Sequence, residues 1–312
     1  MPAEQKTSQS GTRRTVLIAG GANLIVGIAK LIAGVLTGSS AMLAEAAHSA
    51  ADTLDQGFLL ASVHRGARPA DRRHPFGYGQ ERYFWSLLAA FGIFIAGAGF
   101  SFFEGLLALR RSGGGDFLVA YVVLGISFIA ECISLLRAVM QMRGEARSAR
   151  RELIDHVRSS RDTTVKTALF EDTAALAGLA LAAAGLLLRQ LTGSAVWDGA
   201  ASMAIGALLV AVAIKLGLDS KDLLIGKAAD PRTLARIRDE IAQTPGIDSV
   251  VELLTMQLGP DHLIVGARVD LDNSISAGQA EKLADDIDRR LAERLALVPH
   301  VFIDPTRAPA NR

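Results

Sequence analysis

Six long apolar segments constrain this chain more than any other feature of its sequence. They cover residues 15–37, 40–63, 83–109, 117–140, 163–188 and 196–216. Each provides about the 20 residues that a helix needs to cross the hydrocarbon core of a bilayer. Strands of this length would leave backbone groups without hydrogen-bond partners in lipid. The sequence therefore predicts six transmembrane helices.

Positive charge is distributed unevenly among the segments that connect these spans. The segments after the third and fifth spans hold only Arg110, Arg111 and Arg189. The N-terminal tail and the segments after the second and fourth spans hold many more: Lys6, Arg13, Arg14, Arg65, Arg68, Arg72, Arg73, Arg82, Arg143, Arg147, Arg150, Arg151, Arg158, Arg161 and Lys166. Because basic loops stay in the cytoplasm, both termini are predicted to be cytoplasmic.

Several classes of protein and partner are disfavoured by composition. The single cysteine, Cys132, excludes an intramolecular disulfide framework and a zinc site built from several cysteines. The first apolar run is too long for the core of a cleavable signal peptide. Topology and attraction to anionic lipid explain the basic loops, so no nucleic-acid partner is expected. The expected location is a bacterial inner or plasma membrane.

The sequence becomes polar after the sixth span. A helix is predicted to begin at Pro231, followed by two strands (IDSVVELLTMQL and HLIVGARVDL), a helix after Ser276 and a short strand, HVFIDP. This order predicts a small α+β domain whose two helices cover one face of a sheet. The expected organisation is a tail at 1–14, a transmembrane domain at 15–216, a cytoplasmic domain at 217–307 and a second tail at 308–312.

Two of the spans carry clusters of acidic residues at positions where charge is costly. The second span contains Glu45, His48, Asp52 and Asp55. His48 and Asp52 are four residues apart, so they lie on one helix face, about one turn from each other. Charged groups at membrane depth normally mark a functional pathway.

The fifth span contains adjacent carboxylates, Glu171 and Asp172. A divalent cation bound by one imidazole and two or three carboxylates would offset the charge of both spans. These donors suit Zn²⁺, with Fe²⁺, Co²⁺ and Mn²⁺ as alternatives. Asp172 is the favoured ligand of this span, and the role of Glu171 stays open. Glu45 and Asp55 are candidates for an access path or for polar packing.

Four stretches of the sequence are distinctive: TGSSAMLAEAAHSAADTLDQ in the second span, HPFGYGQERYFW before the third, FEDTAALAG in the fifth, and LTMQLGPDHLIVGARVDLD with VFIDP near the C-terminus. Together they resemble the cation diffusion facilitator family of zinc and other divalent-metal transporters. The resemblance implies six spans and a cytoplasmic ferredoxin-like domain. It also implies a homodimer, formed through both domains, that exports divalent cations from the cytosol in exchange for protons. No prosthetic group is expected.

The resemblance also extends to individual residues. His48 and Asp52 match the metal-binding pair of the family's second span, and Asp172 matches an acidic ligand of its fifth span. The family usually has His or Asp four residues before that ligand, where this chain has Ala168. Glu171 is the obvious substitute, although it points about 100° around the helix from Asp172.

Two secondary metal sites of the family are only partly matched. In the loop before the third span, Asp71 and His74 match, but Tyr78 replaces a further histidine. In the C-terminal domain, Asp304 matches, whereas His262 and His300 are interpreted as ordinary surface or packing residues. We therefore expect the C-terminal domain to act in dimerisation rather than in metal sensing.

Two other functional classes remain as alternatives to a metal/proton antiporter. An intramembrane metalloenzyme could use the same donors to activate water. The spans contain no H-E-x-x-H motif and no second histidine, which disfavours that class. A passive cation channel would conduct independently of a pH gradient, and a high-affinity ligand set argues against fast conduction.

Overall fold

The computed structural model describes residues 3–110, 117–148, 163–259, 262–295 and 298–307. The chain divides into two compact units, each treated separately below. The first comprises Met1–Val63 and Phe84–Ser220, and the second comprises His64–Tyr83 and Lys221–Arg312. The basic segment 149–162 and the tail 308–312, both considered above, lie outside the described residues.

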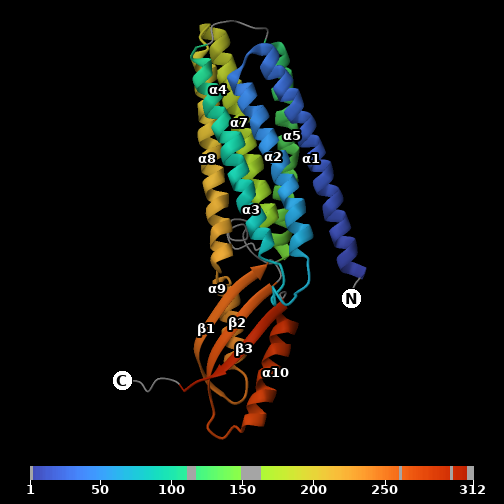
Figure 1. The fold of residues 1–312 in the computed structure, drawn as a ribbon, viewed down its shortest axis with the longest axis vertical. Helices are drawn as coiled ribbons and strands as arrows, with labels where there is room; N and C mark the ends of the chain where they lie inside the picture. Colours follow the sequence, from blue (N-terminus) through green and yellow to red (C-terminus); the bar gives the residue numbers. More distant parts are fainter. Residues whose placement is uncertain (1–2, 111–116, 149–162, 260–261, 296–297, 308–312) are drawn as a thin grey trace, which may run out of the picture. The chain divides into compact units, whose positions relative to one another are not determined.

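The first unit is a bundle of long helices with one helical segment for each predicted span (Figure 1). The third span is divided among three consecutive elements. In chain order the elements are α1 (Ala3–Thr37), α2 (Ser40–Gly66), α3 (Glu81–Gly92), η1 (Ile93–Gly99), α4 (Phe100–Ala108), α5 (Leu118–Ser148), α7 (Thr163–Thr192) and α8 (Val196–Ile225). Helix α1 already begins at Ala3, within the segment predicted to be a polar tail.

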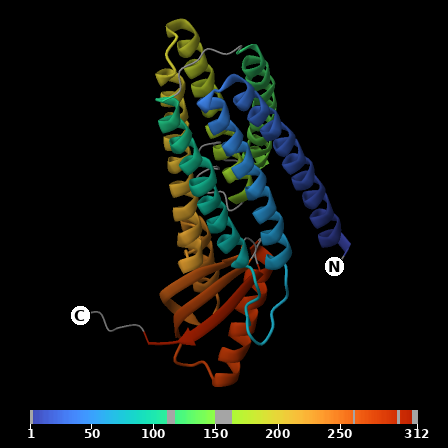
Figure 2. The ribbon, with the colours of Figure 1, turned by 45° about the horizontal axis from the view of Figure 1, so that its top comes forward.

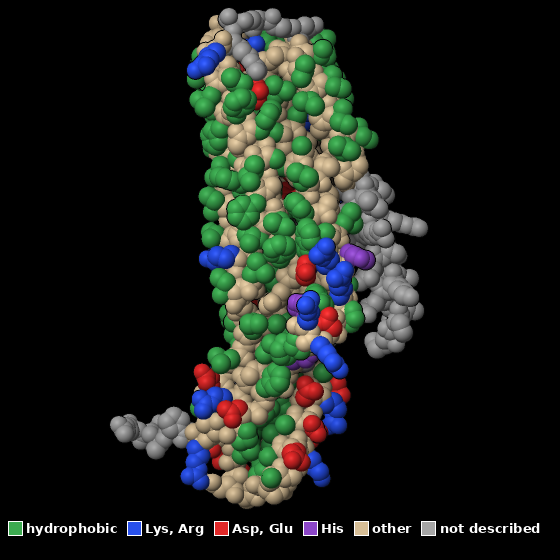
Figure 3. All heavy atoms as spheres, in the orientation of Figure 1, with side chains coloured by type: hydrophobic (Ala, Val, Ile, Leu, Met, Phe, Trp, Pro, Cys, Tyr) green, Lys and Arg blue, Asp and Glu red, His purple; other side chains and the backbone are tan. Residues whose placement is uncertain are grey.

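Five of the six helical segments are long and apolar enough to cross a membrane by themselves. Helix α2 matches them in length, at 27 residues, but Glu45, Asp52 and Asp55 interrupt its apolar sequence. Hydrophobic side chains cover the visible surface of the bundle (Figure 3). Ile25 and Leu191, for example, are 70% and 72% exposed. Such an apolar exterior is stable when lipid surrounds it.

The third span differs from the continuous α-helix that was predicted. Its central residues, Ile93–Gly99, form a π-helix between α3 and α4. Gly97 lies in this segment, and a Cβ added there would come within 3.0 Å of Leu209 and 3.7 Å of Ala51. The π-helical turn thus packs closely against both α8 and α2. Pattern analysis missed it because both helix types produce an equally apolar sequence.

Small residues permit close helix packing within the bundle. A Cβ added at Gly199 of α8 would lie 2.8 Å from the carbonyl oxygen of Gly105 in α4. The bundle interior is likewise built largely from alanines, with Leu179, Leu186, Ile205 and Leu209 among its larger side chains. In lipid this close van der Waals packing is a main source of helix association.

The second unit contains the predicted α-β-β-α-β order. Its elements are α9 (Pro231–Ala242), β1 (Ile247–Gly259), β2 (His262–Leu271), α10 (Ala277–Arg294) and β3 (Val298–Pro305). In the sheet formed by these strands, β2 is central, antiparallel to β1 and parallel to β3. Figure 2 shows this sheet and its helices from a second direction.

Local sequence signals set the ends of these helices. Asp230 caps α9 by accepting a hydrogen bond from the Thr233 backbone N–H at 3.1 Å, and Pro231 occupies the first turn. Gly246, with φ of +96°, follows the helix where the chain turns into β1. Both helices cover one sheet face, as predicted, burying a shared core: Ile237, Ile241, Leu263, Val265, Ala267, Val269, Leu283, Ile287 and Leu291.

Candidate metal centre

Helix α2 presents His48 and Asp52 on one face. His48 Nδ1 and Asp52 Oδ1 are 3.5 Å apart, which is longer than a normal hydrogen bond. Their side chains are only 4% and 14% exposed. Among the residues that the structure describes, neither of these two atoms has a hydrogen-bond partner, and neither does Nε2 of His48. The nitrogen and oxygen atoms of this buried pair are therefore available to bind a metal ion.

Helix α7 carries the acidic pair of the fifth span. Oδ2 of Asp172 accepts a hydrogen bond from Ser134 Oγ of α5 at 2.8 Å. Glu171 is oriented differently, and its Oε1 is buried with no hydrogen-bond partner from the described residues. Helix geometry explains the difference, because adjacent residues point about 100° apart. The Asp172 carboxylate is therefore held in place by α5, whereas Glu171 Oε1 is available to bind a metal ion.

Acidic residues of three helices face a common interior. Glu171 of α7 interacts electrostatically with Asp55 and Asp52 of α2, and with Glu131 of α5. Glu131 in turn interacts with Asp52 and Asp172. Several carboxylates in one low-dielectric region repel one another unless cations or protons neutralise them. The interior of the bundle is therefore suited to attract positive charge.

The predicted ligands do not form a closed coordination shell. Within the described part of the chain, no three His, Cys, Asp or Glu side chains are close enough to hold one metal ion. His48 and Asp52 are brought together, and Asp172 lies on a different helix beside Ser134. Binding one ion with all of these residues would require α2 and α7 to approach each other.

Glu45 has a partner that sequence reasoning missed. Lys30 Nζ of α1 donates a hydrogen bond to Glu45 Oε2 at 2.8 Å, and both side chains are almost completely buried. Gly178 of α7 packs against the same carboxylate so closely that an added Cβ would overlap Oε1. The sequence did contain a signal for this pair. Lys30 lies inside an otherwise apolar span, and a cation at such a position requires a partner. Glu45 thus belongs to a buried ion pair between α1 and α2.

The residues of the loop between α2 and α3 lie in the second unit. Asp71 Oδ1 accepts hydrogen bonds from the backbone N–H groups of Arg73 and His74, and Oδ2 accepts one from the Tyr78 hydroxyl at 2.8 Å. The His74 backbone hydrogen bond and then the Tyr78 bond lower the pKa of Asp71. His74 Nδ1 lies 3.6 Å from Asp71 Oδ1. The Tyr78 hydroxyl therefore donates a hydrogen bond to the Asp71 carboxylate. The family resemblance implied a histidine ligand at position 78 instead.

Two of the three remaining candidates in the C-terminal domain, His300 and Asp304, contact other side chains. The ring of His300 lies 5.5 Å from that of Phe76, centroid to centroid. Oδ2 of Asp304 accepts a hydrogen bond from Arg268 Nε at 3.2 Å. His262 is exposed at the start of β2. These contacts give His300 and Asp304 packing and pairing roles in this structure.

The chain belongs to the cation efflux family, the cation diffusion facilitators. Residues 16–225 match the family model described as the cation efflux transmembrane domain, and residues 229–305 match the cation efflux protein cytoplasmic domain. The family assignment confirms the predicted class of multi-pass helical membrane protein with a C-terminal α+β domain.

Similar proteins handle different metals. The chain is 34% identical over 266 residues to the Xenopus laevis mitochondrial proton-coupled zinc antiporter SLC30A9, covering 85% of this chain and 47% of that protein. It is 27% identical to the Cupriavidus metallidurans metal cation efflux system protein CzcD, covering 91% and 84%, and 23% identical to the Bacillus subtilis manganese efflux system protein MneP, covering 94% and 95%. The chain spans about half the length of the SLC30A9 relatives.

Proposed function

We propose that this protein exports Zn²⁺ from the cytosol in exchange for protons, using His48, Asp52, Glu171 and Asp172 as metal ligands. The observation that carries the proposal is a set of buried side-chain atoms on two facing helices that have no hydrogen-bond partner in the described part of the chain: both ring nitrogens of His48, Asp52 Oδ1 and Glu171 Oε1. Buried polar atoms normally have partners, because leaving them unsatisfied is costly. A transported cation would supply that partner.

The donor chemistry favours zinc among the candidate metals. One imidazole with carboxylate oxygens matches the ligands that Zn²⁺ takes in proteins. Two of the relatives named above differ in the metal that their names give: SLC30A9 is named for zinc and MneP for manganese. Mn²⁺, Fe²⁺ and Co²⁺ are therefore the competing substrates in the test below.

Metal binding and proton binding compete for the same side chains in the proposed cycle. A metal ion binds the neutral imidazole and the ionised carboxylates, and binding releases any protons that they carry. Protonation on the far side of the membrane weakens the ligands and releases the metal. Because the two pairs of ligands lie on α2 and α7, relative movement of these helices would alternately assemble and open the site. Asp55 and Glu131 would extend the acidic path toward it.

The proposed arrangement in the membrane places both termini in the cytoplasm of a bacterial cell. It rests on the bias of positive charge toward the N-terminal tail and the loops after the second and fourth spans. We propose a transmembrane domain at 15–216 and a cytoplasmic domain at 217–307. A homodimer formed through both domains is supported by the match of residues 229–305 to the cytoplasmic domain of the family.

Reconstituted protein tests the transport reaction directly. Purified protein in liposomes that enclose a pH-sensitive dye is given Zn²⁺, Mn²⁺, Fe²⁺ or Co²⁺, and metal uptake and proton flux are followed together. Asp52→Ala and Asp172→Ala are expected to abolish Zn²⁺-driven proton flux, because each removes a metal ligand. Asp285→Ala, which removes an exposed carboxylate from α10, serves as the matched control.

Three results would each contradict a part of the proposal. Full transport in Asp52→Ala or Asp172→Ala would exclude the proposed ligands. Metal flux that ignores an imposed pH gradient would exclude proton exchange and favour a channel. Faster exchange with Mn²⁺, Fe²⁺ or Co²⁺ than with Zn²⁺ would reject zinc as the substrate and retain the transport mechanism.

A further inference from the structure

The start of α2 is capped by a carboxylate from a distant helix. Asp198, in the first turn of α8, is completely buried. Its Oδ1 accepts hydrogen bonds from Ser39 Oγ at 2.7 Å and the Ala41 backbone N–H at 3.3 Å, and its Oδ2 accepts one from the Ser40 backbone N–H at 2.7 Å. These first N–H groups of α2 have no partners within the helix. Asp198 of α8 therefore caps the N-terminus of α2.

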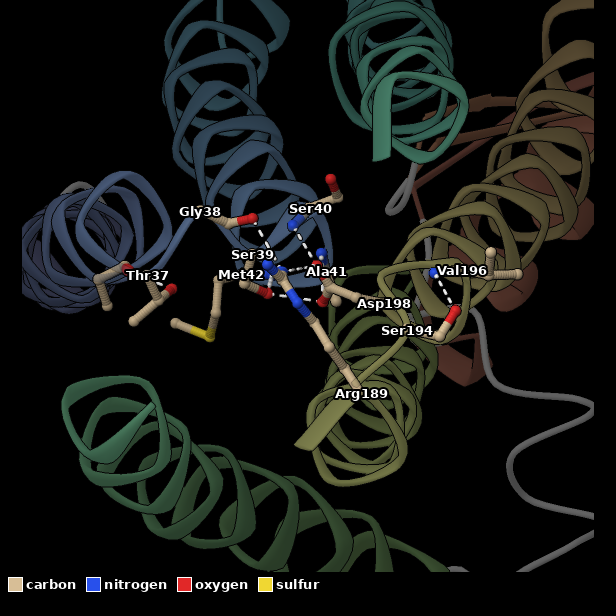
Figure 4. A network of polar contacts seen from close by, with 11 residues as sticks. Thr37, Gly38, Ser39, Ser40, Ala41, Met42, Arg189, Ser194, Val196 and Asp198 are labelled. Atoms are coloured by element: carbon tan, nitrogen blue, oxygen red, sulfur yellow. Dashed lines mark hydrogen bonds and ion pairs between the residues drawn. The ribbon is translucent and has the colours of Figure 1, made fainter. Parts of the chain in front are cut away.

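Arg189, near the end of α7, joins the same network. Its Nη1 donates to Asp198 Oδ2 and to the Gly38 carbonyl oxygen, each at 3.0 Å. Its guanidinium carbon lies 5.2 Å from the ring centroid of Phe117, at the start of α5. Figure 4 shows Arg189 and Asp198 converging on the turn between α1 and α2. Segments far apart in the sequence thus meet around one buried ion pair.

Close packing surrounds this ion pair. Gly38 adopts a positive φ of +61°, which lets the chain reverse between α1 and α2. A Cβ added at Gly34 would lie 3.1 Å from the Leu43 backbone nitrogen, and one at Gly185 would lie 3.2 Å from the Trp197 carbonyl oxygen. Ser39 and Ser40 are fully buried. This end of the bundle is therefore closed in the structure.

We propose that Arg189, Asp198 and the first residues of α2 form a clamp that closes this end of the transport pathway. The clamp fixes α2 and α7 to each other, and these are the helices that carry the proposed metal ligands. Opening the pathway on this side requires the N-terminus of α2 to leave Asp198. In the proposed orientation, this is the extracytoplasmic end. The inference rests on the proposed transport function.

The charges of the clamp stabilise its closed conformation. The Asp198 carboxylate is offset by Arg189 and by the partial positive charge at the start of α2. Hydrogen bonds that involve an ionised group are about twice as strong as neutral ones. Removing one partner leaves the other charge buried without compensation. A change at Asp198 should therefore shift the clamp toward its open state, and the metal ligands would be affected only through helix position.

Side-specific thiol labelling tests this clamp. In a Cys132→Ala background, Met42→Cys places a reporter on the first turn of α2, where Met42 is fully buried. A membrane-impermeant maleimide is added to right-side-out and inside-out vesicles. Asp198→Asn should raise the labelling rate about tenfold, the shift expected for losing one charge-assisted hydrogen bond. The rise should occur only from the side that carries the α1–α2 turn.

Two further variants keep the result interpretable. Ser39→Ala removes the hydrogen bond to Asp198 Oδ1 and the one that Ser39 Oγ accepts from the Met42 backbone N–H, but it keeps the ion pair, so a smaller rise is expected. Asp219→Asn makes the same chemical change on the same helix, where Asp219 pairs with Lys215, and should leave labelling unchanged. Equal labelling in Ser39→Ala, Asp198→Asn and Asp219→Asn would overturn the clamp.

The outcome separates the clamp from the proposed transport reaction. Unmodified protein is assayed in parallel for Zn²⁺-driven proton flux. If flux occurs but Asp198→Asn labels at the control rate, the clamp is wrong and the transport function stands. If flux is absent but Asp198→Asn exposes the reporter from one side only, the closed end is supported and the substrate assignment is wrong.

Discussion

Lys30 of α1 and Glu45 of α2 form a buried ion pair whose Nζ and Oε2 atoms are 2.8 Å apart. The two side chains are 1% and 0% exposed, so neither charge is screened by solvent. The pair lies one helical turn from His48 and contributes positive charge next to Asp52. The pair therefore links α1 to α2 about one turn before His48, the first of the proposed metal ligands.

Removing the lysine from this pair should destabilise the protein strongly. Lys30→Met leaves the Glu45 carboxylate buried and uncompensated, at a cost of about 3–5 kcal/mol. Lys30→Met combined with Glu45→Leu should recover most of the loss, because no charge is then left unpaired. Thermal unfolding in detergent measures both variants. Lys215→Met breaks the exposed pair with Asp219 and should change stability by less than about 1 kcal/mol.

Glu171 is predicted to replace the ligand that is missing at Ala168. Glu171→Gln should weaken Zn²⁺ binding by at least about tenfold, as expected for losing a charged ligand oxygen. Ala168→His in the same background places an imidazole one turn before Asp172 and should restore affinity. Calorimetric titration of purified protein provides the measurement. Unchanged affinity in Glu171→Gln would remove Glu171 from the ligand set.

Ser134 is predicted to orient Asp172. Ser134→Ala removes the 2.8 Å hydrogen bond to Oδ2 and should lower Zn²⁺ affinity about 10- to 100-fold, the range found for residues that support metal ligands. Ser127→Ala is the matched control, because Ser127 is buried on the same helix, α5, and its hydroxyl has no hydrogen-bond partner in the part of the chain that the structure describes. Similar affinities in the two variants would argue against an orienting role.

The Asp71 turn should depend on pH in a defined direction. Hydrogen bonds from the His74 backbone and the Tyr78 hydroxyl lower the pKa of Asp71 below its value in the unfolded chain. The stabilisation of the turn is therefore complete above the unfolded pKa of about 3.9 and is lost as the pH falls through the lower folded pKa. Tyr78→Phe should raise the pKa of Asp71 by removing one of these bonds.

Carboxyl carbon shifts in full-length protein labelled at aspartate measure that pKa. Asp272 is an internal control, since hydrogen bonds from the backbone and side chain of Ser274 also lower its pKa. The titration curve of Asp272 should be the same in the unmodified protein and in Tyr78→Phe. If the Asp71 curve does not move in Tyr78→Phe, the hydroxyl contributes nothing to the charge state of the carboxylate.

Much of the architecture follows from local patterns. The six spans were predictable because long apolar runs in lipid leave the backbone no alternative to a helix. The α-β-β-α-β order of the C-terminal domain followed from Pro231, Gly246, Ser276 and the strand runs between them. His48 and Asp52 were predictable as a pair because a separation of four residues places them on one face of a helix whatever surrounds it.

Contacts between helices depended on the tertiary structure. Helical periodicity does not determine which faces of α1, α2, α5, α7 and α8 meet, so it could not pair Lys30 with Glu45 or Ser134 with Asp172. The π-helix in the third span was equally hidden, because the same apolar residues fit either helix type.

The physical reason lies in the range of the interactions. Secondary structure is set by residues a few positions apart, and the sequence alone therefore determined the spans, the C-terminal domain and the ionisable residues of α2 and α7. Buried charges are satisfied by any partner that the packing brings close, at any separation along the chain. Only the tertiary structure could show that Asp198, 158 residues after Ser40, caps the helix that carries His48 and Asp52.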